Sequence, residues 1–254
     1  MIPLGDEGTP PRRGLPVVNL TIIAINILVF ALQWLTGLED GPITGGWSLI
    51  PREITTGHDL IGLIPVNGTG DVIQLFAAPL GSVYLTLLTS MFMHGGLLHI
   101  GSNMLFLFIF GDNVEDNFGS LKYLIFYLLC GFAADFTQII LGGGDSVIPN
   151  LGASGAIAGV LGAYLVLFPQ ARIRALIPIF GFGMFGSVPA FIMIGFWILT
   201  QIISVFAAQE QSVGGGGGVA FWAHIGGFFT GLLLSFLFRS RSSNTGSPFP
   251  AFNR

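Results

Sequence analysis

The chain has 254 residues, of which 52% are hydrophobic and only 9% charged, whereas about a quarter of the residues of a soluble domain are charged. A mean hydropathy of +0.79 excludes a soluble globular protein. The net charge of −4 is small and no basic run is present, so nothing indicates nucleic acid as a partner. The single cysteine, Cys130, cannot form an intrachain disulfide, and its apolar neighbours indicate a buried, inert thiol.

Six segments are long and apolar enough to cross a bilayer, because a spanning helix needs ~20 mostly apolar residues. In chain order they are residues 17–35, 97–110, 121–141, 149–168, 187–207 and 219–238. The second is short unless it starts earlier, near Leu87. We therefore expect an all-α, multi-pass membrane protein. Its six-helix bundle would occupy residues 17–238, between a cytoplasmic N-terminal segment, 1–16, and a disordered cytoplasmic tail, 239–254.

The positions of the basic residues predict the orientation, because positive charge in short loops stays on the cytoplasmic side. Basic residues precede the first span, separate the second from the third and the fourth from the fifth, and follow the sixth: Arg12, Arg13, Lys122, Arg172, Arg174, Arg239 and Arg241. The alternate loops contain only Arg52. Both termini are therefore expected in the cytoplasm. The first span lacks a small-residue cleavage site, and the short polar N-terminus without a transit sequence favours a prokaryotic plasma (inner) membrane.

Two loops between the spans are unusual in composition. Residues 36–86 are rich in Gly and Pro yet keep apolar residues, which predicts a loop that lies on or dips into the outer interface and is not a second domain. Residues 214–218 are five consecutive glycines just before the sixth span, which predicts a mobile outer loop.

A candidate nucleophile opens the fourth span, in Gly152-Ala153-Ser154-Gly155. A serine in the first turns of a helix lies near backbone N–H groups that the helix does not use, and these can stabilise an oxyanion. The tetrapeptide alone is a weak signal, because serine near a helix start is commonly a cap.

His224 in the sixth span is the matching candidate base. It shares a helix face with Gly227 and Gly231, and such small-residue stripes let another backbone come close. The fourth span carries matching stripes, Gly155/Gly159/Ala163 and Ser154/Ala158/Gly162. Ser154 and His224 each lie about five residues into their helices, so we expect them at the same depth. A lone histidine is more often structural or ion-conducting, but this pairing favours a nucleophile and its base.

The remaining intramembrane polar residues admit several readings. His99 and Asn103 are four apart and share a helix face, as donors aimed at a carbonyl oxygen would. Zinc binding competes, but asparagine is a poor zinc ligand and the usual histidine spacing is absent. For His94, a structural hydrogen bond or an interfacial anchor is favoured over chemistry. Asp135 in the third span is either hydrated near a helix end or orients His224; we expect a dyad rather than a triad.

The order of these motifs resembles the rhomboid family of intramembrane serine proteases: His94, His99-x-x-x-Asn103, Gly152-Ala153-Ser154-Gly155 and Ala223-His224-x-x-Gly227-x-x-x-Gly231. The resemblance covers about residues 85–238. It implies that Ser154 is the nucleophile and His224 its base. It also implies that His99, Asn103 and the Ser154 N–H form the oxyanion site. Glu115 matches an acidic position that holds the cytoplasmic helix ends together in this family.

The chain departs from the family pattern in two regions. Ala158 stands where an aromatic residue often stacks under the catalytic histidine, so support for His224 must come from elsewhere, such as Trp222 or a phenylalanine. The Trp-Arg pair of the first outer loop is missing, and Thr86 stands where many members have arginine. Both changes leave the expected catalytic residues in place.

The sequence therefore predicts a serine endopeptidase that cleaves transmembrane or membrane-adjacent segments of other membrane proteins inside the bilayer, with no metal or cofactor implied. The fifth helix and the 214–218 loop are the expected gate for such substrates. Two alternatives remain open: a non-proteolytic membrane-protein binder or chaperone with this fold, and a channel or transporter that uses His99 and His224 as proton sites.

Overall fold

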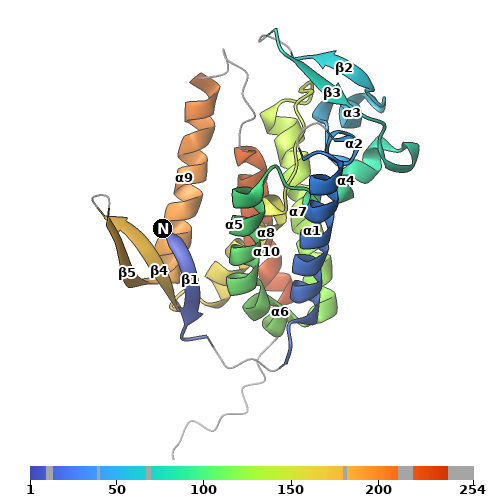
Figure 1. Cartoon of the computed structure of the whole chain (residues 1–254). Coiled ribbons are helices and arrows are strands. Elements are labelled where there is room, and N and C mark those ends of the chain that lie inside the picture. Colours follow the sequence, from blue (N-terminus) through green and yellow to red (C-terminus); the bar gives the residue numbers. More distant parts are fainter. Residues whose placement is uncertain (10–13, 39–40, 67–69, 180–181, 211–219, 240–254) are drawn as a thin grey trace, which may run out of the picture.

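The computed structural model describes residues 1–9, 14–38, 41–66, 70–179, 182–210 and 220–239. Figure 1 shows a bundle of long helices, with α9 standing at one side of the others. The long helices are α1 (Val17–Thr36), α5 (Leu97–Phe106), α7 (Ser120–Gly142), α8 (Ser154–Leu167), α9 (Ala190–Glu210) and α10 (Phe221–Phe238). The expected loop at 214–218 and the expected tail at 240–254 lie outside the described residues.

Four helical stretches of the described chain are long and apolar enough to cross a membrane: 17–36, 97–118, 120–142 and 221–238. The apolar helices at 154–167 and 190–206 are shorter, so the length criterion bears out four of the six expected spans. Several spanning helices in one chain make this an integral, multi-pass membrane protein.

The second span gains its length at the end opposite to the one expected. It starts at Leu97, because Gly96 is fully extended and the residues before it form short turns. It continues past α5 through a π-helical turn, Leu107–Gly111, into α6 (Asp112–Phe118). The suggested start near Leu87 is therefore wrong.

Five strands in the described residues correct the expectation of an all-α fold. β1 (Ile2–Glu7), β4 (Arg172–Ile179) and β5 (Phe182–Pro189) form an antiparallel sheet in the order β1-β4-β5. β2 (Gly62–Pro65) pairs with β3 (Val72–Leu75) in a hairpin. In β4, Ile173 is buried while Arg172 and Arg174 are exposed, and this alternation suits a half-buried strand rather than a helix.

The region between α1 and α5 packs onto one end of the bundle, at the top of Figure 1. It contains α2 (Pro42–Trp47) and α3 (Pro51–Thr56) besides the β2/β3 hairpin. Its apolar residues Leu49, Ile50 and Leu75 are at most 1% exposed. The Thr55 hydroxyl donates to the carbonyl oxygen of Gly144 just after α7 (3.0 Å). These contacts fold the region onto the bundle.

Glu115, in α6, ties three helices together at the opposite end. Its carboxylate is 2% exposed and accepts hydrogen bonds from the N–H groups of Val18 and Asn19, at 3.1 and 2.7 Å. The Ser120 hydroxyl donates to it as well, at 2.6 Å. A carboxylate at a helix N-terminus satisfies donors that the helix leaves unpaired. The role that the resemblance implied for Glu115 is thus confirmed for α1, α6 and α7.

The tightest helix contact joins α8 to α10. A Cβ atom added to Gly227 would collide with the carbonyl oxygen of Gly155, and one added to Gly231 would collide with that of Gly159. The two backbones therefore touch where side chains would otherwise separate them. The predicted packing of small-residue stripes is confirmed, and it brings the start of α8 beside the start of α10.

Candidate active site

Ser154 is the first residue of α8, so the expectation that it lies five residues into its helix is wrong. The preceding segment cannot be helical, because Gly152 has φ +136° and its N–H donates to the carbonyl oxygen of Ser90 (2.9 Å). Asn150 and Leu49 exchange two backbone hydrogen bonds, at 2.7 and 2.9 Å. The region between α1 and α5 therefore fixes the turn that presents the serine.

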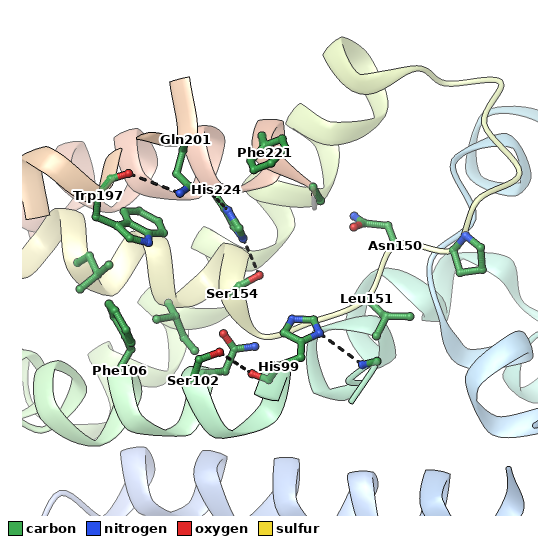
Figure 2. Close-up of a pocket in the computed structure, with 16 residues that line it drawn as sticks. His99, Ser102, Phe106, Asn150, Leu151, Ser154, Trp197, Gln201, Phe221 and His224 are labelled. Atoms are coloured by element: carbon green, nitrogen blue, oxygen red, sulfur yellow. Dashed lines mark hydrogen bonds between the residues drawn. The ribbon is translucent and has the colours of Figure 1, made fainter. Parts of the chain in front are cut away.

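Ser154 and His224 nevertheless meet, as the sequence predicts. His224 is the fourth residue of α10, and its Nε2 atom lies 2.8 Å from Ser154 Oγ. Figure 2 shows the imidazole pointing at the hydroxyl from the neighbouring helix. This is the spacing at which a base can accept a nucleophile's proton.

Backbone donors surround the serine at the start of α8. The helical hydrogen bonds begin with the Ile157 N–H, which donates to the Ala153 carbonyl oxygen at 3.0 Å. The N–H groups of the three preceding residues, Ser154 included, consequently have no acceptor within the helix. Free N–H groups beside a nucleophile can hold an oxyanion.

His99 projects from α5 toward the same point. A Cβ atom on Gly152 would lie 2.9 Å from His99 Nε2 and 3.5 Å from Ser154 Oγ, so these groups are separated by little more than one atom. The Gly95 N–H donates to His99 Nδ1 at 3.4 Å. Since Nδ1 is an acceptor here, Nε2 of the neutral ring carries the hydrogen and is a donor.

Asn103 and His94 are linked to each other. Asn103 Nδ2 lies 2.9 Å from His94 Nε2, which orients the amide and leaves its second N–H available. The His94 backbone pairs with the Gln33 side chain, with its N–H donating at 2.9 Å and its carbonyl accepting at 3.2 Å. His94 is fully buried. Of the two roles favoured for His94, the structure shows the structural hydrogen bond.

The support of the His224 ring comes from α9, not from Trp222. The Trp197 ring lies against the imidazole, with centroids 5.7 Å apart and an interplanar angle of 43°. His224 Nδ1 lies 2.7 Å from Gln201 Oε1. Neither residue is predicted from the sequence; their spacing of four, which places them on one helix face, was the available signal.

Asp135 does not occupy the orienting position beside His224, which Gln201 takes. It lies within α7, away from the ends of that helix, and is only 7% exposed. It lines a small cavity of about 10 Å³ together with Gly152, Ser154 and Gly155. The expectation of a dyad without a carboxylate partner therefore matches the geometry.

The paired side chains line a cavity of about 610 Å³ between four helices. Its walls come from α5, the turn before α8, α8 itself, α9 and the start of α10: Gly95, His99, Ser102, Asn103, Phe106, Pro149, Asn150, Leu151, Ser154, Ile157, Leu161, Trp197, Gln201, Ala220, Phe221 and His224. Figure 2 shows both histidines facing this space. The predicted site residues Ser154, His224, His99 and Asn103 are thus brought together.

Comparison with known proteins gives matching relatives. The family model described as Rhomboid domain matches residues 81–241, more than half of the chain. RHOMBOID-like protein 1 of Arabidopsis thaliana is 31% identical over 156 residues, which cover 61% of this chain and 34% of that protein. Rhomboid protease GluP of Bacillus subtilis (strain 168) is 39% identical over 79 residues, covering 31% of this chain and 15% of that protein.

Not every relative carries the name of an enzyme. Inactive rhomboid protein 1 of Drosophila melanogaster is 33% identical over 81 residues, covering 32% of this chain and 6% of that protein. The matched part of the chain spans about a third, or less, of the length of these curated relatives. The family match nonetheless covers every residue that lines the cavity, and the chain belongs to the rhomboid family.

Proposed function

We propose that this chain is an intramembrane serine endopeptidase that cleaves transmembrane or membrane-adjacent segments of other membrane proteins. The observation that carries the proposal is the 2.8 Å separation of His224 Nε2 and Ser154 Oγ in the wall of a 610 Å³ cavity. The family includes relatives named as a protease and as inactive. Family membership alone therefore does not assign an activity, and the contact between Ser154 and His224 supports the proposal.

The reaction follows from the two groups in contact. Ser154 Oγ attacks the carbonyl carbon of the scissile peptide while His224 Nε2 takes the hydroxyl proton. When the C–N bond breaks, His224 returns that proton to the leaving amine, and the peptide acyl group stays on Ser154 as an ester. Water, deprotonated by His224, then attacks the ester carbonyl carbon. The bond between Ser154 Oγ and the acyl carbon breaks, His224 returns the proton to Ser154 Oγ, and the new carboxylic acid leaves. These steps need no metal or cofactor.

The negative oxygen of each tetrahedral intermediate would be held by three kinds of donor. These are the Ser154 backbone N–H, His99 Nε2–H and an Asn103 amide N–H. The tautomer of His99 set by Gly95 and the amide orientation set by His94 support this assignment. Donors fixed before the reaction stabilise the developing charge without reorganisation.

The distribution of charge supports both termini being cytoplasmic, with the Ser154 end of the bundle facing outward. We infer a prokaryotic plasma membrane as the setting. A substrate helix would reach the cavity sideways past α9, whose Phe196, Leu199 and Ile203 side chains are more than half exposed. Such a face suits contact with lipid or with another transmembrane helix.

A serine-directed electrophile tests the proposed chemistry in the detergent-solubilised protein. A fluorophosphonate should label the wild-type chain at Ser154, and the labelled peptide is identified by mass spectrometry. Ser154→Ala should abolish labelling and cleavage of a transmembrane substrate, and His224→Ala should abolish both as well. Ser102→Ala is the matched control, because Ser102 lines the same cavity but its hydroxyl donates to the His99 carbonyl oxygen.

The alternatives give different outcomes in the same variants. A membrane-protein binder or chaperone would retain its partner in Ser154→Ala, and a channel would retain its conductance. The protease proposal would be contradicted if the fluorophosphonate did not label folded wild-type protein, or if it still labelled Ser154→Ala.

Crosslinking tests the path past α9 separately. Because Cys130 is fully buried, a cysteine pair introduced on the accessible faces of α5 and α9 can be joined selectively. Crosslinked protein should lose cleavage of a transmembrane substrate while a small electrophile still labels Ser154. Unchanged cleavage after complete crosslinking would contradict a gate at α9.

A further inference from the structure

The far side of the His224 ring is held by a neutral side chain of another helix. His224 Nδ1 lies 2.7 Å from Gln201 Oε1, and Figure 2 shows Gln201 reaching over from α9 to the imidazole. An amide oxygen can only accept a hydrogen bond, so Nδ1 must carry the ring hydrogen. Nε2 is then left unprotonated where it faces Ser154.

Local contacts within α9 fix which end of the Gln201 amide faces the ring. The amide nitrogen is 3.3 Å from Thr200 Oγ1 and 3.5 Å from the Trp197 carbonyl oxygen. Both are acceptors for an N–H group, so the nitrogen turns back along the helix and the oxygen turns toward the imidazole. The Trp197 ring, one turn earlier, covers the imidazole.

We propose that Gln201 is the positioning residue of the catalytic histidine, a neutral third member that selects the reactive tautomer and aims Nε2 at Ser154. This proposal rests on the proposed protease function and deepens it. Since Gln201 and Trp197 both belong to α9, displacement of α9 from α10 would release the ring as well as open the cavity. Access of a substrate and alignment of the base are thereby coupled through one helix.

The other groups near the ring do not fill this role. Among the residues that line the cavity, the titratable group besides His224 is His99 from α5, and the Ser154 hydroxyl of α8 faces Nε2. From α7, Asp135 lies beside the small cavity at Ser154. None of these is the hydrogen-bond partner of Nδ1, and the residues that α9 contributes to the cavity, Trp197 and Gln201, are neutral.

Two substitutions of Gln201 separate positioning from packing. Gln201→Leu keeps the approximate volume but removes the acceptor, and should lower kcat about 10- to 100-fold, as loss of a hydrogen bond to a group that becomes charged implies, with KM changed less than about threefold. Gln201→Glu keeps the acceptor and adds charge. It should retain activity, and the acid limb of its pH–rate profile should move up by about one pH unit or more, because a carboxylate favours the imidazolium.

Gln138→Leu is the matched control. Its amide oxygen accepts the N–H of Ala223, at 3.2 Å, one residue before His224, so it anchors the same helix without touching the ring. This variant should lose thermal stability but keep the wild-type pH profile and kcat per folded molecule. If Gln201→Leu and Gln201→Glu instead lose activity only in proportion to folded protein, with no movement of the acid limb, the positioning role is overturned.

A nitrogen NMR spectrum makes the test independent of activity. The chain has four histidines. Comparison of the ¹⁵N-histidine-labelled wild type with His224→Ala therefore identifies the His224 signals. The wild type should show Nδ1 protonated, and Gln201→Leu should shift His224 toward a mixture of tautomers. A wild-type protein that neither reacts with the fluorophosphonate nor cleaves a substrate would refute only the protease function. An unchanged His224 spectrum in Gln201→Leu would refute the positioning role.

Discussion

Two of the helices that pack against α10, α8 and α9, are held to it in different ways. α8 meets α10 through backbone, with glycine positions on each side filled by the carbonyl groups of the other, and its residues from 155 to 164 are all buried. α9 meets α10 through side chains, chiefly Trp197 and Gln201 against His224. Ser154 and His224 thus lie on a pair of helices in backbone contact, while Trp197 and Gln201 lie on the helix that we propose as the gate.

The turn at Gly152, just before α8, is crowded by the side chain of His99. Gly152→Ala would force a side chain into φ +136° and place Cβ 2.9 Å from His99 Nε2. We expect the rate of fluorophosphonate labelling to fall about 100- to 1000-fold, because the oxyanion donors are displaced. Gly143→Ala is the control that separates backbone strain from the filling of space. Gly143 also has a positive φ, +114°, but nothing lies within 4 Å of a Cβ atom added there. Equal losses in both variants would contradict the role of the Gly152 space.

A glycine-to-alanine substitution should have opposite effects on stability in the α8–α10 contact and in α9. Gly227→Ala drives a methyl group into the Gly155 carbonyl oxygen and should lower the free energy of unfolding by about 1–3 kcal/mol. A Cβ atom at Gly195, within α9, meets nothing within 4 Å. Gly195→Ala should therefore stabilise the helix by up to about 1 kcal/mol. Thermal unfolding in detergent gives the two signs, and matching signs would contradict the comparison.

Removal of the Trp197 ring tests whether α9 restrains His224. Trp197→Ala should slow labelling of Ser154 about 3- to 10-fold, in line with about 0.5–1.5 kcal/mol for an aromatic contact, because the His224 ring loses its cover. Trp34→Ala on α1, whose ring is 57% exposed, should leave the labelling rate unchanged. A Trp197→Ala protein that labels at the wild-type rate would show that α9 does not restrain the ring.

The smallest expected effect concerns Glu53 of α3, in the region that fixes the Gly152 turn. Burial raises the pKa of its carboxyl from 4.5 to about 7; repulsion from Asp59 adds to this, and the Leu60 N–H partly offsets it. The protonated acid suits the folded region, so the region is most stable below about pH 4.5 and loses stability as the pH rises through 7. Amide exchange at Leu60, corrected for the intrinsic rate, should show greater protection at pH 5 than at pH 8. Glu53→Gln should remove that difference.

Long apolar runs made most of the helices predictable. The first and third spans were placed to within a residue of α1 and α7, because hydrocarbon thickness sets the length of such a segment. The strands were not predicted, since the alternation in β4 covers only Arg172, Ile173, Arg174 and Ala175 and lies between two apolar helices. Pairing with β1, far away in the sequence, left no local signal.

The site was predicted in its members but not in all its geometry. Ser154 and His224 meet as expected, yet the serine starts its helix, because the Gly152 turn bonds to Ser90 and such a long-range contact cannot be read from local sequence. Trp197 and Gln201 escaped notice because the rotation of α9 decides which of its faces meets His224. The departure from the family pattern at Ala158 correctly indicated that some other group had to support the His224 ring.

The pairing of β1 with β4 has a consequence for the order in which the chain folds during synthesis. Glu7 pairs with Arg172, and Asp6 accepts hydrogen bonds from Asn113 and Tyr164, at 3.0 and 2.9 Å. At about 5–20 residues per second, a ribosome needs roughly ten to thirty seconds to travel from the first strand to its partner. The strand must wait through that interval while the helices insert, so the last of these contacts close only after α8 has been made.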